Sequence, residues 1–360
     1  MSEFFQKCFQ YSVLFGLVLG ASAQACTGIA LSSEDKAQIV ARTIEWGDSK
    51  LNSQLVISPR GRMVQTHTAH GQGMKYSNSL GFVGVSIEEE TFVVEGINEK
   101  GLSAGLFFFP GYGEYPAYQA KSRAQTLSDM QFVGWLLGNF DSIDAVKRGI
   151  KSVRLAALIP EAGTVHYRVA DKSGRQIVIE SIDGEIKIFD NPIGVLTNSP
   201  DFPWHLKNLN NFLNLKTGKA ESVDWSGVKL SQFGMGAGML GIPGDITPPA
   251  RFVRAAYMQS TAPKLAKAKD AVLYSFTILN SFEIPIGLEL KNSDEKTDLI
   301  SATQWTSAMD MTNGVFYYKT DTNYQIRSVE LKNINFAKVK YQVMPLDRVN
   351  EQPIEVMTIK

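Results

Sequence analysis

The sequence predicts an α+β fold built as a four-layer αββα sandwich, in which two mainly antiparallel sheets face each other under outer helices. Three observations support this prediction. Short apolar runs typical of strands fill residues 26–110, helical periodicity follows, and strands and helices then alternate to the C-terminus without a repeat or a low-complexity linker. An ordinary α+β domain is the alternative, because periodicity alone does not count layers.

Residues 1–25 resemble a targeting segment. They have a weakly charged start (Glu3, Lys7), an apolar run too short to span a bilayer, and the small-x-small sequence Ala23-Gln24-Ala25. We therefore expect export with cleavage after Ala25, leaving residues 26–360 as one domain without stable membrane insertion. The alternative is that this segment forms a first apolar strand or helix.

The part that follows the expected cleavage point is predicted to be mostly sheet. Apolar runs bounded by Gly, Asn and Ser turns predict strands at Cys26–Leu31, Gln38–Ile44, Gln54–Ile57, Leu80–Ser86, Thr91–Ile97 and Leu102–Phe109. The first two runs are expected to pair as a hairpin.

Helical spacing of apolar residues predicts a helix over Thr126–Phe140, and Asp141-Ser142 is a capping signal for a second helix that ends near Lys151. Further strands are predicted at Thr164–Ala170, Gln176–Ser181, Ile186–Phe189, Ser301–Met309, Val315–Lys319 and Tyr324–Leu331, with turn signals at Asp171 to Gly174 and at Asp183-Gly184. Further helices are predicted from Pro200 to about Leu213 and at Ala250–Gln259 and Lys264–Leu279, with a loop over the sheet edge at Gly234–Asp245.

The charge balance excludes several partners. The chain has 36 basic and 36 acidic residues, and loss of residues 1–25 removes one of each, Lys7 and Glu3. Neither a nucleic-acid patch nor an acidic tail is indicated, so we expect a small-molecule substrate and no nucleic acid.

Cys26 is the candidate reactive residue. The chain has two cysteines, and Cys8 would leave with the targeting segment, so Cys26 would have no disulfide partner in an oxidising compartment. As the first residue of a mature chain it would carry a thiol beside an α-amine whose ordinary pKa is about 7.7–8.0. That amine could take the thiol proton, so one residue could be both nucleophile and base.

The predicted hairpin places Arg42 and Glu45 near Cys26. A guanidinium favours the thiolate, and a carboxylate can tune the α-amine. The alternative for this pair is a solvated ion pair at the end of a strand.

Five blocks then show a family resemblance. They are Cys26-Thr27-Gly28, Arg42 to Trp46, Gly96 to Leu102, Gly194 to Pro200, and Gly244 to Phe252. In this order they resemble the signature blocks of the choloylglycine hydrolase family, N-terminal nucleophile amidases that include penicillin V acylases and bile salt hydrolases. The resemblance implies hydrolysis of linear amides without metal or cofactor, the N-terminal nucleophile hydrolase fold, and a homotetramer. It is greatest to Gram-negative members, which are linked to penicillin V and N-acyl homoserine lactones, and it implies a periplasmic location.

The resemblance assigns four residues directly. Cys26 matches the nucleophile and Arg42 the arginine beside it. Asn198 matches the asparagine whose N–H would stabilise the oxyanion, and Arg251 the arginine that would hold thiolate and carboxylate in register. Without the family pattern, Asn198 would be a turn residue and Arg251 a surface arginine at a helix start.

Two positions depart from the family. Glu45 stands where an aspartate is usual, and Asp48 is an alternative for that role. Phe108 stands where bile salt hydrolases tend to have asparagine and penicillin V acylases tyrosine, so the oxyanion site would use a backbone N–H, that of Phe108, together with Asn198. Bile conjugates are therefore the alternative rather than the first expectation.

An apolar acyl pocket is expected from the aromatic residues near these blocks. The candidate substrate-binding residues are Trp46, Phe107, Phe108, Phe109 and Tyr112. Because successive strand residues face opposite sides, we expect some of the three phenylalanines to be core residues.

Other functional interpretations of the sequence have less support. His67-x-x-His70 lacks a third metal ligand and is expected in a surface loop. Gly234-x-Gly-x-Gly238 lacks the lysine of a phosphate-binding loop. A function of a different class, a lipid-anchored binding protein with an acylated Cys26, is disfavoured because Ala23-Gln24-Ala25 lacks the aliphatic residue that lipid-attachment sites prefer three positions before the cysteine.

Overall fold

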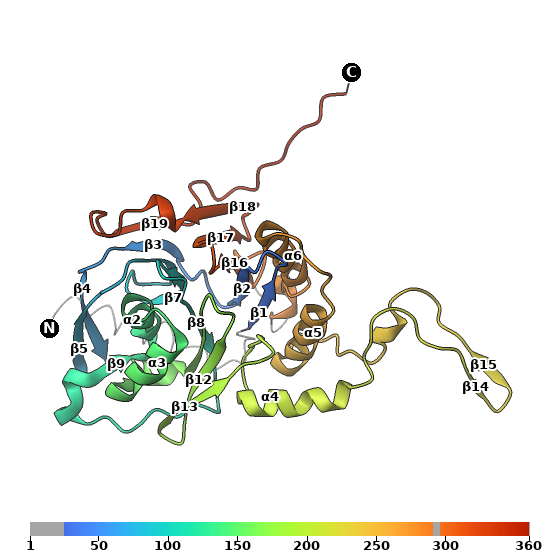
Figure 1. Cartoon of the computed structure of the whole chain (residues 1–360), viewed down its shortest axis with the longest axis horizontal. Coiled ribbons are helices and arrows are strands. Elements are labelled where there is room, and N and C mark those ends of the chain that lie inside the picture. Colours follow the sequence, from blue (N-terminus) through green and yellow to red (C-terminus); the bar gives the residue numbers. More distant parts are fainter. Residues whose placement is uncertain (1–24, 291–295, 360) are drawn as a thin grey trace.

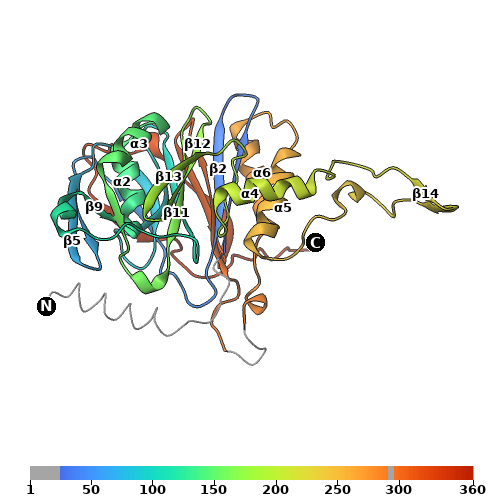
Figure 2. The same cartoon turned by 90° about the horizontal axis from the view of Figure 1, so that it is seen from below.

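Two sheets packed face to face form the centre of the molecule. The structure is a computed structural model that describes residues 25–290 and 296–359 (Figure 1). The expected targeting segment, except Ala25, lies outside the described residues. Helices α2 and α3 lie on the outer side of one sheet, and α5 and α6 lie on the outer side of the other (Figure 2). The predicted four-layer αββα sandwich is confirmed.

The first sheet has five strands in the order β1-β2-β16-β17-β18. Their bounds are β1 Cys26–Ser32, β2 Gln38–Glu45, β16 Thr303–Asp310, β17 Val315–Thr320 and β18 Asn323–Glu330. The predicted hairpin is confirmed, since β1 and β2 are antiparallel with Cys26 opposite Ile44. On its other side β2 pairs with β16, which places Thr303 opposite Glu45.

The second sheet has eight strands in the order β13-β12-β11-β8-β7-β6-β3-β19. Their bounds are β3 Gln54–Ser58, β6 Phe82–Ser86, β7 Val93–Asn98, β8 Ser103–Phe108, β11 Val165–Ala170, β12 Gln176–Ile182, β13 Glu185–Asp190 and β19 Gln342–Pro345. The predicted turn between β12 and β13 is present, with positive φ at Asp183 (55°) and Gly184 (71°). Strand β19 was not predicted, because it is short and has little alternation.

The helices are α2 Phe132–Asn139, α3 Ile143–Gly149, α4 Phe202–Asn208, α5 Pro248–Ser260 and α6 Ala268–Asn280. Short 3-10 turns lie at Ala120–Gln125, Asp129–Gln131, Ile150–Ser152, Pro160–Ala162, Leu209–Phe212, Ala237–Met239, Ile286–Leu288 and Leu331–Asn333. As predicted, Ser142 caps α3, its side chain accepting from the N–H of Ala145. The helix predicted from Thr126 begins only at Phe132, because Thr126–Ser128 form strand β9, which pairs in parallel with β10, Arg154–Ala156.

Two further hairpins lie outside the two main sheets; the first replaces a predicted surface loop, and the second was not predicted. Strands β4 (Met63–Thr68) and β5 (Gly71–Ser77) pair around His67 and His70, so this stretch is a hairpin rather than an irregular surface loop. Strands β14 (Val223–Trp225) and β15 (Val228–Leu230) lie in a long projection, here called the arm (residues 213–241). The arm extends away from the sheets, so the glycine-rich stretch does not cover a sheet edge as predicted (Figures 1 and 2).

Most of the core is apolar, but several charged side chains are also buried, and three of them lie together between the sheets. Arg42, Arg168 and Glu95 are 0–1% exposed. No helix within residues 25–290 or 296–359 is long and apolar enough to cross a membrane.

Candidate active site

Cys26 begins strand β1 and is 5% exposed. Its backbone N–H donates to Oδ1 of Asn198 at 2.9 Å. Asn198 lies beside Cys26 because Gly28 and Leu196 form two backbone hydrogen bonds with each other, of 2.7 and 3.1 Å. These bonds hold the 194–200 segment beside β1. The structure thus joins two residues that are 172 positions apart in the chain.

Arg251, in the first turns of α5, connects the same two residues. One of its terminal nitrogens donates to the carbonyl of Cys26 at 2.5 Å and to Oγ1 of Thr27 at 2.9 Å. The other donates to Oδ1 of Asn198 at 2.7 Å. Besides these bonds to neutral acceptors, the charge of Arg251 lowers the pKa of the Cys26 thiol and of Glu45, so it favours the ionised forms of both groups.

The thiol of Cys26 lies in a field of opposing charges. Burial raises its pKa, Arg42 and Arg251 lower it, and Glu45 raises it. A hydrogen bond from the backbone N–H of Phe108 also favours the thiolate. The arrangement brings one nucleophilic sulfur, two cations and a backbone donor to the same place, as nucleophilic catalysis requires.

Arg42 is held from the opposite sheet. Its guanidinium donates to the carbonyl of Leu106 at 2.5 Å and lies 3.3 Å from Oε2 of Glu95. Arg168 lies 3.5 Å from the other oxygen of Glu95, and the guanidinium of Arg42 stacks 4.0 Å from the centre of the Phe107 ring. Burial lowers the pKa of Arg168 to about 10.

Glu45 is the buried carboxylate on the other side of the thiol. It is 1% exposed, and Oε1 accepts from the hydroxyl of Thr303 at 3.3 Å, whereas Oε2 has no hydrogen-bond partner among the described residues. Burial raises its pKa to about 7, against the opposing effect of Arg251. Asp48 is exposed, so the structure favours Glu45 for the position that the family gives to aspartate.

Glu289 is a further carboxylate that the sequence did not indicate. Both of its oxygens are enclosed without a hydrogen-bond partner among the described residues. Burial and the nearby charges of Glu45 and Asp48 raise its pKa to about 8. Its carboxylate packs so closely on Gly47 that a Cβ there would overlap it.

Phe108 contributes backbone and ring to the site. Its carbonyl accepts from Nδ2 of Asn198 at 2.8 Å, so one hydrogen of that amide is already used. Its ring meets Trp46 edge to face, with centroids 6.4 Å apart. Both side chains are partly exposed, which fits an apolar wall beside Cys26.

The other aromatic candidates lie elsewhere. Phe107 and Phe109 are 0% exposed, because residues two apart on a strand share a face and this face is packed in the core. The prediction that they line a substrate pocket is therefore corrected. Tyr112 is 50% exposed beyond the end of β8, with its ring 6.2 Å from that of Phe109.

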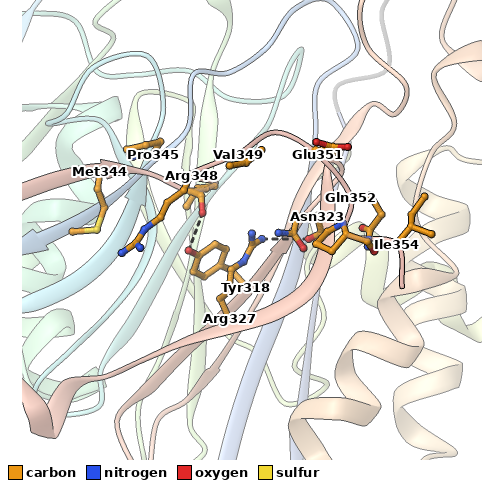
Figure 3. Close-up of a pocket in the computed structure, with 12 residues that line it drawn as sticks. Tyr318, Asn323, Arg327, Met344, Pro345, Arg348, Val349, Glu351, Gln352 and Ile354 are labelled. Carbon is orange, nitrogen blue, oxygen red and sulfur yellow. Dashed lines mark hydrogen bonds between the residues drawn. The ribbon is translucent and has the colours of Figure 1, made fainter. Parts of the chain in front are cut away.

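A separate cavity of about 710 Å³ lies between β18, β19 and the C-terminal segment (Figure 3). Its lining includes Tyr318, whose hydroxyl donates to the carbonyl of Leu346 at 3.0 Å. None of its lining residues belongs to the group around Cys26. Within the described ranges, no three His, Cys, Asp or Glu side chains come together as metal ligands.

Known proteins resemble this chain over most of its length. A family model, linear amide C–N hydrolases of the choloylglycine hydrolase family, matches residues 26–344. A bile salt hydrolase/transferase of Clostridium perfringens is 32% identical over 316 residues, covering 86% of this chain and 93% of that protein. A penicillin V acylase of Pectobacterium atrosepticum is 25% identical over 350 residues, covering 90% and 86%.

A solved structure agrees with these matches. A variant of conjugated bile acid hydrolase from Clostridium perfringens is 27% identical, with a TM-score of 0.78, covering 92% of this chain and all of that one. The resemblance inferred from the sequence blocks is therefore confirmed. The chain belongs to the choloylglycine hydrolase family and is a hydrolase of linear carbon–nitrogen amide bonds.

Proposed function

We propose that Cys26 is the N-terminal nucleophile of this amidase, released by cleavage after Ala25. The observation that carries the proposal is the hydrogen bond from the Cys26 nitrogen to Oδ1 of Asn198, together with the bond of Arg251 to the same oxygen. After cleavage this nitrogen becomes the α-amine. Oδ1 of Asn198 then accepts a hydrogen bond from the α-amine, which is the base that the mechanism needs.

The reaction proceeds in two halves. The α-amine takes the thiol proton, sulfur attacks the amide carbonyl, and the oxyanion is held by the N–H of Phe108 and the second hydrogen of the Asn198 amide. The carbon–nitrogen bond breaks as the ammonium protonates the leaving nitrogen. Water then attacks the thioester, giving one proton to the amine, and the carboxylic acid leaves as the thiol is restored.

The acyl group is proposed to be aryl or aliphatic, as in penicillin V or N-acyl homoserine lactones. The edge-to-face pair of Trp46 and Phe108 supports this, because it offers apolar surface beside the thiol. Conjugated bile salts are the second candidate. They are favoured by relatives named bile salt hydrolase/transferase, which are 32% and 33% identical to this chain.

Activity of the Cys26→Ala variant tests the mechanism. We expect loss of turnover with penicillin V, an N-acyl homoserine lactone and glycocholate, while thermal stability stays near that of the wild type. Retained turnover would end the mechanism. Comparison of wild-type kcat/KM for the same three amides then assigns the substrate class.

A lipid-anchored binding protein is the rival proposal. Against the rival proposal, Cys26 is only 5% exposed, and its nitrogen, which a lipoprotein would also carry acylated, is bonded to Oδ1 of Asn198. Intact mass of the protein purified from the periplasm distinguishes the two, since the amidase begins with unmodified Cys26 and the anchored protein carries a lipid adduct. Recovery of the protein in the periplasmic fraction of the cells tests the proposed location.

We propose that the protein self-associates as a homotetramer and that the arm supplies contacts. Its large apolar side chains are unusually exposed: Trp225 (70%), Val228 (60%), Phe233 (110%) and Met235 (81%). The double variant Trp225→Ser, Phe233→Ser is expected to lower the molar mass measured by light scattering. Met63→Ser, exposed on β4 outside the arm, is the control.

A further inference from the structure

Two buried histidines bind the segment that carries Asn198. An isolated bridge joins Leu196 of this segment to Gly28, and residues 197–200 that follow it belong to neither a helix nor a strand. Nε2 of His166 lies 3.1 Å from the carbonyl oxygen of Thr197, and Nε2 of His205 lies 2.8 Å from that of Asn198. Both histidines are 0% exposed. Successive carbonyls of the site segment are thus each held by an imidazole from a different element.

Each imidazole is itself fixed against another part of the site. His166 lies 3.0 Å from Oε1 of Glu180 and stacks on Phe109, with ring centroids 4.5 Å apart and planes 8° from parallel. His205 stacks on Phe252, at 4.6 Å and 13°. Phe109 follows Phe108 in the chain and Phe252 follows Arg251. The two rings therefore connect the Asn198 segment to the chain next to Phe108 and Arg251, two of the three residues with which the Asn198 side chain bonds.

The hydrogen on His205 can be assigned from its partner. A carbonyl oxygen only accepts, so Nε2 of His205 carries the hydrogen. Burial lowers the pKa of His205 to about 4, so the ring is neutral at pH 7 and Nδ1 is bare. Nδ1 has no hydrogen-bond partner among the described residues. His205 thus provides a fixed N–H donor over the working pH range rather than a proton-transfer group.

We propose that His205 and His166 are positioning residues for the reaction, which place the Asn198 amide against the Cys26 amine through the carbonyls of residues 197 and 198. This inference rests on the proposed role of Cys26. A displacement of the Asn198 backbone moves Oδ1 from the amine and from Arg251, and Nδ2 from Phe108, because all three contacts belong to one short side chain. Displacements of about 1 Å at a reaction centre cost up to about a hundredfold in rate.

A matched pair of variants tests this role. His205→Gln keeps an amide N–H near the position of Nε2, whereas His205→Asn is also a neutral amide but ends nearer the position of Nδ1. With the best of penicillin V, an N-acyl homoserine lactone and glycocholate as probe, we expect the asparagine variant to lose about tenfold to a hundredfold in kcat with little change in KM. The glutamine variant should recover most of that loss.

The pH profile provides a readout that a purely structural role would not move. Oδ1 of Asn198 accepts from the amine and so favours its protonated form, which raises the pKa of the amine. We therefore expect the acidic limb of kcat/KM to move to lower pH in His205→Asn and to stay in place in His205→Gln. Equal losses in both variants with an unmoved limb, or wild-type kinetics in both, would overturn the proposal.

Two controls make the result unambiguous. Thermal denaturation shows whether each variant is folded, and if His205→Asn does not fold, the pair His166→Gln and His166→Asn carries the same test at Thr197. Cys26→Ala separates the two proposals. Turnover in Cys26→Ala defeats the amidase mechanism, whereas an inactive Cys26→Ala with unaffected histidine variants defeats only the positioning role.

Discussion

The two buried arginines on either side of Cys26 differ in what neutralises them. Arg42 shares a carboxylate, Glu95, with Arg168 inside the core, 3.3 and 3.5 Å from its oxygens. Arg251 donates to the carbonyls of Ile246 and Cys26, to Thr27 and to Asn198, all neutral acceptors. The hydrogen bonds of Arg251 are therefore directed at the site, whereas Arg42 forms its ion pair between the sheets, although its charge also favours the Cys26 thiolate.

Because of this difference, we expect the Arg42 side to contribute mainly to the stability of the fold and the Arg251 side mainly to the reaction. A buried ion pair costs desolvation that only its partner offsets, so breaking the Arg42 side is expected to unfold the protein before it affects the mechanism. On the Arg251 side, removal of the guanidinium releases Asn198 and Cys26 while most of the core stays packed.

The largest effect is expected for Glu95→Gln. The change leaves two buried guanidiniums without their carboxylate, and the free energy of unfolding should fall by about 3–5 kcal/mol. Chemical denaturation measures it. Arg175→Gln, which breaks the exposed pair of 2.9 Å bonds to Asp144, is the control and should lower the free energy of unfolding far less, because water screens exposed charges. A similar cost for both variants would contradict the comparison.

Arg251→Gln should act mainly on the reaction. Loss of the bonds to Cys26 and Asn198 is expected to lower kcat/KM by about a hundredfold, the size of effect seen when one oxyanion-site contact is lost. Steady-state kinetics measures it. Arg254→Gln, on the same helix but bonded to the carbonyls of Pro243 and Asp245, should stay near wild type. Activity of Arg251→Gln within threefold of wild type would show that its charge is not directed at the site.

Gly28→Ala should disturb the Arg42 side by crowding. A Cβ at this position would lie 2.8 Å from a guanidinium nitrogen of Arg168 and 2.9 Å from the Phe107 ring. The expected cost is about 1–3 kcal/mol of unfolding free energy, measured by thermal denaturation. Gly234→Ala, where a Cβ meets nothing within 4 Å, is the control. An unchanged melting temperature for Gly28→Ala would contradict the prediction, because it would mean that Arg168 and Phe107 move aside at little cost in free energy.

The smallest effect is expected for Glu289→Gln, and it depends on pH. The pKa of Glu289 is raised from 4.5 to about 8, so the folded state binds the proton more tightly than the unfolded state. Stability from this group is thus complete below pH 4.5 and is lost as pH rises through 8. The Glu289→Gln variant should not lose stability in this way. Because the group is partly exposed, we expect the unfolding free energy of the variant at pH 9 to exceed that of the wild type by about 1 kcal/mol. Melting curves from pH 5 to 9 measure it, and parallel curves for both proteins would contradict it.

Local patterns in the sequence predicted part of the site. Strand alternation and a short polar turn placed Arg42 and Glu45 beside Cys26 through the hairpin register. Asn198 and Arg251 were identified only because their blocks resemble a family, since each alone has an ordinary alternative. Glu95, Arg168, Glu289 and the two histidines gave no signal, because polar residues on strands and turns are usually solvated.

The sequence by itself determined the order of most strands of the two main sheets and of their covering helices, the hairpin around Cys26, and the family blocks, since these depend on side-chain period and on short-range chemistry. Only the tertiary structure decided which polar groups lie together away from water. Cys26 and Arg251 are 225 positions apart, yet the pKa of each is shifted first by burial, which depends on how the layers pack. Desolvation is a property of the whole neighbourhood, so no local pattern encodes it.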